Sequence, residues 1–246
     1  MKILVCISKT PETTAKIAFA DGGTKFSEDG VQYILNPYDE WYALVRALEL
    51  VEASGGEVVL GHVGLAANDS IIRKGLAVGA TRAVRFDAEP TSTEMVAKQI
   101  AAHAANENYD LILCGKETID YNGALLGGMI AAELGLPYIS FVSHLDVNGD
   151  EYTATRDIEG GVEVSKVNAP VVISASKGLA EQRIPKMRDI MMSKRKPIDV
   201  IPAVPTDDTT TVVKYRLPQE NQGVKMLSPD DMDELVRLLN EEAKVL

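Results

Sequence analysis

Short apolar runs that alternate with helical segments set the strongest limit on how this chain can fold. The runs cover residues 2–7, 57–63, 83–86, 111–114 and 138–142. The helical spacing of apolar residues lies between them, at 40–53, 69–78, 91–107 and 123–134. Strands that are apolar at successive positions are buried on both faces, and the alternation supplies helices to cover those faces. The sequence therefore predicts an α/β fold with a mostly parallel, doubly wound sheet.

The pattern of strands changes after Pro137. Further strands are predicted at 145–147, 151–156, 162–167 and 171–175. Asn148-Gly149 lies between alternating residues, which is a strong hairpin signal, so we expect these strands to form an antiparallel edge. Residues 17–33, with their Gly-Gly and Asp-Gly pairs, are expected to form a hairpin-like excursion.

The ends of several helices are marked by capping residues and prolines. Asn36 before Pro37 predicts an N-cap followed by proline at the first helical position, and Ser92 or Thr93 is expected to cap the helix at 91–107. A short helix is predicted at 184–192, ahead of the basic residues 194–196. Residues 228–231 are expected to cap a last helix at 232–245.

The composition after Pro197 differs from that of the preceding chain. Prolines, threonines and acidic residues follow one another there, which is typical of a linker or an extended arm. We therefore expect an α/β domain at 1–196 and an arm at 197–246. A helix tethered by irregular chain suits a clasp on a partner better than a monomer.

Charge and composition exclude several classes of partner and site. The net charge of −11 argues against nucleic acid or an anionic membrane as the main partner, although one nucleotide could still be bound by backbone dipoles. No apolar run approaches the roughly 20 residues of a membrane-spanning helix, and no signal peptide is recognised, so we expect a cytoplasmic protein. Cys6 and Cys114 lie in apolar runs and are expected to be buried thiols. The three histidines have no metal-ligand spacing with them, which indicates no zinc site.

One stretch, Leu111–Met129, carries the best functional signal. An apolar strand is followed by the polar turn at 115–118 and then by a small-residue helix. This order places backbone N–H groups at a helix start, where a phosphate is stabilised. The segments 6–9, 61–64 and 114–116 are expected to meet there, because ligands of open α/β sheets bind at the carboxyl edge. Neither GxGxxG nor GxxxxGK[ST] occurs, so simple small-residue turns remain an equal alternative.

No arrangement of nucleophile and base stands out in the sequence. Ser8 and Ser140 have no histidine nearby, and the carboxylates at 157, 159 and 163 are expected to be exposed hairpin residues. The basic residues 194–196 predict a solvated face or a contact with an acidic partner. Met187, Met191 and Met192 fit either a core or an adaptable docking surface. These residues indicate a nucleotide-binding α/β domain with an arm.

Several motifs together resemble one family, the β subunit of electron transfer flavoprotein. The resemblance spans nearly the whole chain and rests on MKILVCISKTPE at 1–12, NPYDE at 36–40, the GK-x-x-I-D…G segment within 113–127, RDIEGGVE at 156–163 followed by PVV at 170–172, and IPKMRDIMMSKRKPIDV at 184–200. It implies an adenine-nucleotide α-hydrolase-like, Rossmann-like fold. It also implies a heterodimer whose α subunit holds most of the FAD, while the β subunit binds AMP or a second FAD.

The resemblance also implies which residues form each site. The nucleotide contacts would be Cys6, Ser8, Asn36, Tyr38, Asp39, Val63, Gly115, Lys116, Asp120, Leu125, Leu126 and Gly127. Partner docking would fall to Ile184, Met187 and Met191, and the tail helix would embrace the α subunit. The chain departs from the family pattern at 124–126, Ala-Leu-Leu, where many members have polar residues. Backbone N–H groups could still hold a phosphate there. A smaller departure is Ser165, where an aliphatic residue is usual.

The leading hypothesis is an electron carrier rather than a catalyst of bond chemistry. Flavin dehydrogenases would supply electrons, FAD would carry them, and a quinone- or ferredoxin-linked acceptor would receive them. One alternative is an electron-bifurcating complex in which this chain carries its own FAD and meets NADH. A second alternative, from another class, is a stand-alone nucleotide-binding stress-type module, which the long arm disfavours.

Overall fold

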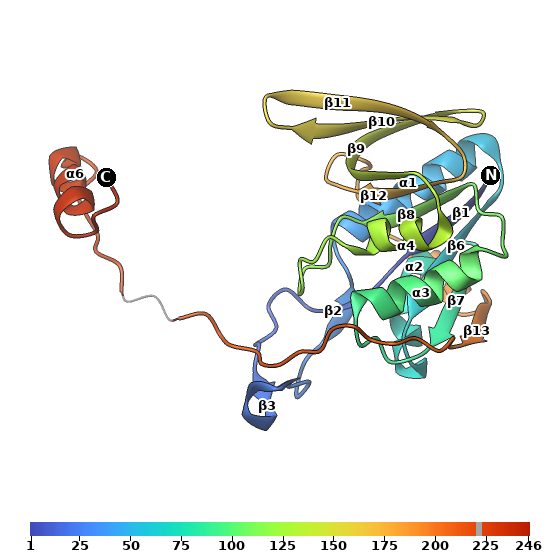
Figure 1. Cartoon of the computed structure of the whole chain (residues 1–246), viewed down its shortest axis with the longest axis horizontal. Helices are drawn as coiled ribbons and strands as arrows, with labels where there is room; N and C mark the ends of the chain where they lie inside the picture. The colour runs from blue at the N-terminus through green and yellow to red at the C-terminus, as the bar shows by residue number, and fades with distance from the viewer. Residues whose placement is uncertain (220–222) are drawn as a thin grey trace. The chain divides into compact units, whose positions relative to one another are not determined.

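A nine-stranded sheet forms the centre of the fold in the described residues, which are 1–219 and 223–246 of a computed structural model. Its strand order is β11-β10-β9-β12-β8-β1-β6-β7-β13. All neighbours from β9 to β13 pair parallel, whereas β9, β10 and β11 pair antiparallel. The predicted α/β fold, with a mostly parallel sheet and an antiparallel edge, is therefore confirmed (Figure 1).

The bounds of the elements follow the predicted alternation closely. The strands of the large sheet are β1 (Lys2–Cys6), β6 (Glu57–Val63), β7 (Arg82–Asp87), β8 (Leu111–Gly115), β9 (Tyr138–Asn148), β10 (Glu151–Ile158), β11 (Gly161–Asn168), β12 (Val171–Ala175) and β13 (Ile198–Pro202). The helices are α1 (Asp39–Ser54), α2 (Asp69–Val78), α3 (Thr93–Ala104), α4 (Leu126–Leu134), α5 (Met187–Ser193) and α6 (Met232–Glu241), with short 3-10 turns at η1 (Asp21–Gly23) and η2 (Ala66–Asn68). Two small antiparallel pairs join β2 (Lys9–Pro11) to β5 (Tyr33–Leu35) and β3 (Phe19–Ala20) to β4 (Lys25–Phe26).

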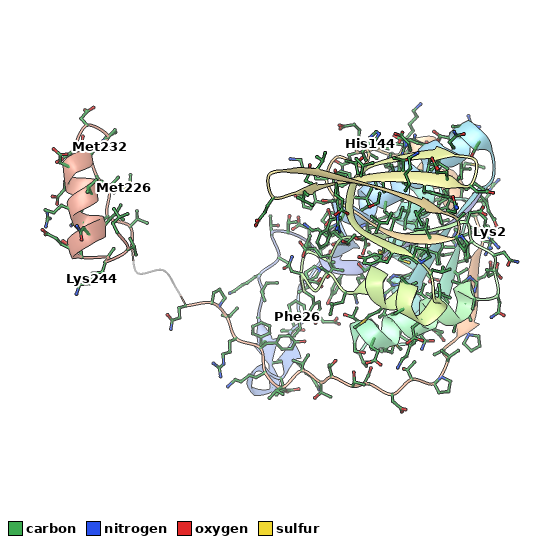
Figure 2. The ribbon with its side chains drawn as sticks, turned by 45° about the horizontal axis from the view of Figure 1, so that its top comes forward. Lys2, Phe26, His144, Met226, Met232 and Lys244 are labelled. Atoms are coloured by element: carbon green, nitrogen blue, oxygen red, sulfur yellow. The ribbon has the colours of Figure 1, made fainter. Side chains whose placement is uncertain are left out.

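Helices cover both faces of the parallel sheet, which explains the unbroken apolar runs. On β1, Ile3 and Val5 belong to the core that α1 and α2 share, whereas Leu4 and Cys6 belong to the core beneath α3 and α4. Figure 1 shows α3 and α4 side by side on their face of the sheet, and Figure 2 shows side chains filling the space beneath the helices. Successive residues of a central strand therefore face opposite helical layers.

Three sequence predictions are corrected by the strand pairing. β12 lies inside the sheet, parallel to both β8 and β9, and is not part of the antiparallel edge. Its residues are all buried, which suits a strand covered on both faces. The strand predicted at 145–147 is the second half of β9, which continues through a register irregularity near Val142. Residues 198–202, expected in the arm, form β13 and pair parallel with β7.

Two predicted helix starts are also corrected. Asn36 does not cap a helix, because α1 begins at Asp39 and Tyr38 occupies the N-cap position. The helix predicted from Gly123 begins only at Leu126, since Ala124 has a left-handed backbone with φ of 53°. The caps predicted for two other helices are confirmed: Ser92 accepts the Met95 N–H, and Asp231 accepts the Glu234 N–H.

Contacts divide the described residues into two compact units. One comprises residues 1–17 and 27–213, and the other comprises residues 18–26 and 214–246. In the second unit, the Phe19 ring stacks on Tyr215 with centroids 5.0 Å apart, and Phe26, labelled in Figure 2, meets Phe19 edge to face. The arm predicted at 197–246 includes residues 220–222, which lie outside the described residues. None of the helices described is long and apolar enough to cross a membrane.

Candidate functional site

The carboxyl ends of β8, β1 and β6 lie next to one another, as the sequence predicts for the segments that follow them. The three strands are neighbours in the sheet, with Cys6 paired to Gly61 and Val5 paired to Leu113. Beyond the strands, the Ile7 N–H donates to the Gly61 carbonyl at 2.9 Å. The segments 6–9, 61–64 and 114–116 therefore share one edge of the sheet.

A buried carboxyl group, Glu40, lies at the exit of β1. The Ser8 N–H donates to Glu40 Oε2 at 2.7 Å, and Ser8 Oγ donates to Glu40 Oε1 at 2.5 Å. Glu40 is only 3 % exposed. Burial raises the pKa of its carboxyl to about 8, although the hydrogen bonds from Ser8 and Asn36 favour the charged form; the negative charge of Asp120 adds to the rise. The Glu40 carboxyl is therefore mostly protonated below about pH 8 and mostly charged above it.

Asn36 joins the exit of β1 to the loop that follows β8. Its N–H donates to the Ser8 carbonyl at 3.0 Å. Its side-chain Nδ2 donates to the Glu117 carbonyl at 3.1 Å, and its Oδ1 accepts the Ile119 N–H at 3.1 Å. The side chain is completely buried, so these bonds are shielded from water. Because Oδ1 already accepts the Ile119 N–H, it is not free to cap α1.

The turn after β8 packs tightly against the start of α1. A Cβ atom on Gly115 would lie 2.8 Å from Glu40 Cγ and 3.0 Å from the Glu40 nitrogen, so glycine is required for this approach. Lys116 then pairs with Glu117 at 3.3 Å. Burial raises the pKa of Asp39, and the positive charge of Lys116 opposes that rise.

The start of α4 presents backbone N–H groups near the end of β8, where Gly127 packs against Cys114. The first turn of a helix has no intrahelical acceptors for its N–H groups, and no side chain of the described residues caps this one. Leu125 occupies the N-cap position and is 53 % exposed. Gly127 in the first turn is buried against Tyr138 and Cys114. The uncapped N–H groups and the positive end of the helix dipole suit an anion.

The other residues predicted for the nucleotide site differ in what they can offer. Cys6 and Val63 are buried in the core, and burial raises the pKa of the Cys6 thiol well above its usual value, so only their backbones are available. Asp120 is exposed in the loop after β8. Tyr38 is 58 % exposed and has φ of 65°. Such a backbone is strained for a bulky residue, and strain of this kind is concentrated at functional sites.

Sequence reasoning missed two buried polar residues at this edge, Glu40 and His62. His62 is held between the Ile7 carbonyl, 2.9 Å from Nδ1, and Asn68 Nδ2, 3.1 Å from Nε2. Burial lowers the pKa of its imidazole, which favours the neutral ring with a proton on Nδ1. Both residues had a sequence signal: His62 interrupts an apolar strand, and Glu40 precedes Ala43 and Leu44 in the buried stripe of α1.

A second candidate surface lies on α5 and the residues before it. The side chains predicted for docking are strongly exposed, at 81 % for Ile184, 74 % for Met187 and 67 % for Met191. The interpretation of Met187 and Met191 as core residues is therefore wrong. Contiguous exposed apolar side chains mark interaction sites.

Ion pairs and hydrogen bonds hold both ends of this exposed segment. At its start, Arg183 makes two hydrogen bonds to the Glu52 carboxylate of α1, at 2.6 and 3.0 Å. At its end, Lys196 Nζ donates to the carbonyls of Leu76, Gly79 and Ala80 at the end of α2. Arg73 of α2 donates to the Ser193 and Lys196 carbonyls. The basic run at 194–196 is therefore partly structural, because Lys196 caps a helix.

Comparisons with known proteins agree on one family. The family model of the electron transfer flavoprotein domain matches residues 23–206. Proteins named electron transfer flavoprotein subunit beta are similar over the whole chain, with 31 % identity in Bacillus subtilis and 34 % in Bradyrhizobium diazoefficiens, each covered completely. The human protein of that name is 31 % identical over 94 % of this chain and 95 % of its own length.

The packing of Gly127 gives a first prediction. In Gly127→Ala, the new Cβ would lie 2.7 Å from Tyr138 Cε2 and 2.8 Å from Cys114 Sγ. We expect a loss of about 1–3 kcal/mol in the free energy of unfolding, measured by urea denaturation, because overpacking outweighs the gain in helix propensity. Gly123→Ala is the matched control. No heavy atom of the described chain lies within 4 Å of its Cβ position, so this variant should unfold at an unchanged or slightly higher urea concentration. Equal losses in the two variants would contradict the packing.

The pKa of Glu40 gives a second prediction. Its carboxyl has a pKa of about 8 when folded, raised from its usual 4.5. Protonation therefore favours the folded chain: this contribution to stability is complete below about pH 4.5 and is lost as the pH rises to about 8. Glu40→Gln cannot titrate, so its stability relative to the native chain should increase steadily between pH 5 and pH 8. Urea denaturation across this range measures the difference, and parallel curves would disprove it.

Proposed function

Because the chain belongs to the electron transfer flavoprotein β-subunit family, we propose that it forms a heterodimer with an α subunit and completes the site of an FAD held mainly by that partner. Similarity over the full length of the relatives supports this role. FAD supplies the one- and two-electron chemistry when it is bound. The chain's own contribution is to bind, position and dock, so we infer an electron carrier and not a catalyst of bond chemistry.

We propose that the edge formed by the exits of β1, β6 and β8 binds AMP. The observation that carries this proposal is the uncapped first turn of α4, in which Gly127 packs against Cys114 near the end of β8. The N–H groups of Leu126 and Gly127 would hold the phosphate, with the Lys116 ammonium nearby in the same loop. Because the side chains at 124–126 are apolar, the phosphate would be bound there by backbone N–H groups. The remaining proposed contacts are Cys6, Ser8, Asn36, Tyr38, Asp39, Val63, Gly115, Asp120 and Leu125.

We propose that the segment around Met187 docks the electron-donating dehydrogenases. Its apolar side chains are exposed, while Arg183 and Lys196 fasten its two ends to the domain. A segment held in place loses less conformational entropy on binding than a free loop, which raises affinity. The identity of the donors, a quinone- or ferredoxin-linked acceptor and the cytoplasmic location stay predictions of the sequence.

The content of the purified complex tests the proposed cofactors. Coexpression with an α subunit should give a yellow heterodimer with one FAD and one AMP, measured by absorbance and by mass spectrometry of the released nucleotides. Two FAD and no AMP would support the electron-bifurcating alternative instead. A colourless homodimer that binds ATP or AMP would support the stand-alone nucleotide-binding module and would overturn the proposal.

Substitution of Met187 tests the docking surface. We expect Met187→Ala to slow reduction of the heterodimer by a dehydrogenase partner by roughly tenfold, because an exposed apolar anchor at the centre of an interface is worth on the order of 1–2 kcal/mol. The flavin spectrum and the AMP content should not change. Val200→Ala, on the exposed face of β13, is the matched control and should react at the native rate. An unaltered rate in Met187→Ala would place docking elsewhere.

A further inference from the structure

One buried carboxyl group joins the segments that surround the proposed nucleotide site. Glu40 belongs to the first turn of α1, and both of its oxygens accept hydrogen bonds from Ser8, which follows β1. Its side chain also hydrogen bonds to Asn36, which follows β5. Gly115, at the end of β8, packs directly against Glu40 Cγ. Chain segments far apart in the sequence therefore meet at this side chain.

Asn36 extends the network into the loop that leads to α4. Its amide bridges the Glu117 carbonyl and the Ile119 N–H, at 3.1 Å each. The polar groups of this loop are thus fixed by Asn36, and Asn36 is fixed by Ser8 and Glu40. A change at Glu40 would be transmitted through hydrogen bonds to the loop that precedes the uncapped helix.

We propose that Glu40 is a positioning residue that holds the exits of β1 and β8 in the binding geometry, and that nucleotide binding at this edge is coupled to protonation of its carboxyl group. The proposal rests on the proposed function of this edge as a nucleotide site. Glu40 need not touch the nucleotide, because it acts through Ser8 and Asn36.

The coupling has an electrostatic cause. A bound phosphate adds negative charge at the edge where the carboxylate lies in a low dielectric, and like charges disfavour ionisation. Asp120 in the loop after β8 already adds negative charge, and Asp39, Lys116 and Glu117 face one another at the adjoining turn. The thiols of Cys6 and Cys114 also face Glu40, and their raised pKa values keep them neutral. Nucleotide binding should therefore be accompanied by proton uptake.

The sign of the pH dependence follows from this uptake. Below the pKa of the free site, which is about 8, Glu40 is already neutral and the phosphate meets no repulsion from it. Above that value a proton must be taken up, so affinity falls as the pH rises. A glutamine at position 40 stays neutral, can accept the Ser8 N–H and can donate to Ser8 Oγ. It should bind the nucleotide without this pH dependence.

Calorimetric titration of AMP onto the nucleotide-stripped heterodimer, from pH 6.5 to pH 9.5, tests the proposal. A parallel titration uses FAD as the ligand in place of AMP. We expect the native complex to lose roughly tenfold in affinity above pH 8 relative to Glu40→Gln, which should match it within about threefold at pH 6.5. Glu40→Ala leaves Ser8 and Asn36 without their acceptor and should bind roughly tenfold more weakly at every pH. Titration of the AMP phosphate is common to all variants, so the difference between profiles reports Glu40.

Glu49→Gln is the matched control. Glu49 lies on the same helix and pairs with Arg46 instead of Ser8, so this variant should follow the native profile. Circular dichroism and FAD content show that each variant is folded; if Glu40→Ala does not fold, the comparison of Glu40→Gln with the native complex decides alone. Native and Glu40→Gln profiles that coincide, in complexes that bind AMP, would overturn only the role of Glu40. A native complex that binds neither AMP nor FAD would overturn the proposed nucleotide site as well.

Discussion

The parallel pairing of β1 with β6 and β8 is the interaction on which the rest of the structure depends. It places three chain exits, more than fifty residues apart in sequence order, at one edge, and it buries β1 between two helical layers. Because a parallel strand must be followed by a crossover, the exits of β6 and β8 lead into loops and then α2 and α4, whereas the small strands β2 to β5 separate β1 from α1. The edge therefore gathers loop backbones and a helix start, and the proposed nucleotide site would be made largely of main-chain groups.

A site made of main-chain groups depends on side chains that hold the loops in place. At this edge those side chains are buried and polar: Glu40 and Asn36 fasten the β1 and β8 loops, and His62 fastens the β6 exit to Ile7. Buried polar groups are costly unless they are hydrogen bonded, so a network of this kind specifies one loop geometry. In the proposed site, main-chain groups would contact the ligand, whereas the buried side chains fix the geometry of the loops.

In the exposed segment at α5, too, one set of side chains is exposed and another set holds the segment in place. Ile184 and Met187 face solvent, whereas Arg183 and Lys196 at its ends bind α1 and the C-terminus of α2. The C-terminal end of a helix dipole favours a cation, so Lys196 has a position that both stabilises α2 and anchors the segment. The surface proposed for partners is thus attached to the same helices that cover the sheet.

The sequence by itself determined the fold class, because the alternation of apolar runs and amphipathic segments is local and each strand carries its own burial signal. It also located the turn after β8, but it left Met187 and Met191 between a core and a docking surface, and the structure shows that both are exposed. It did not determine where β12 pairs, since an apolar run is equally suited to several places in a sheet. Nor did it show that Asn36 binds the 117–119 loop instead of capping α1, or that Glu40 is buried beside Ser8. Those contacts join residues far apart in the chain, and only the packing of α1 against β1 and β8 brings their donors and acceptors within hydrogen-bonding distance.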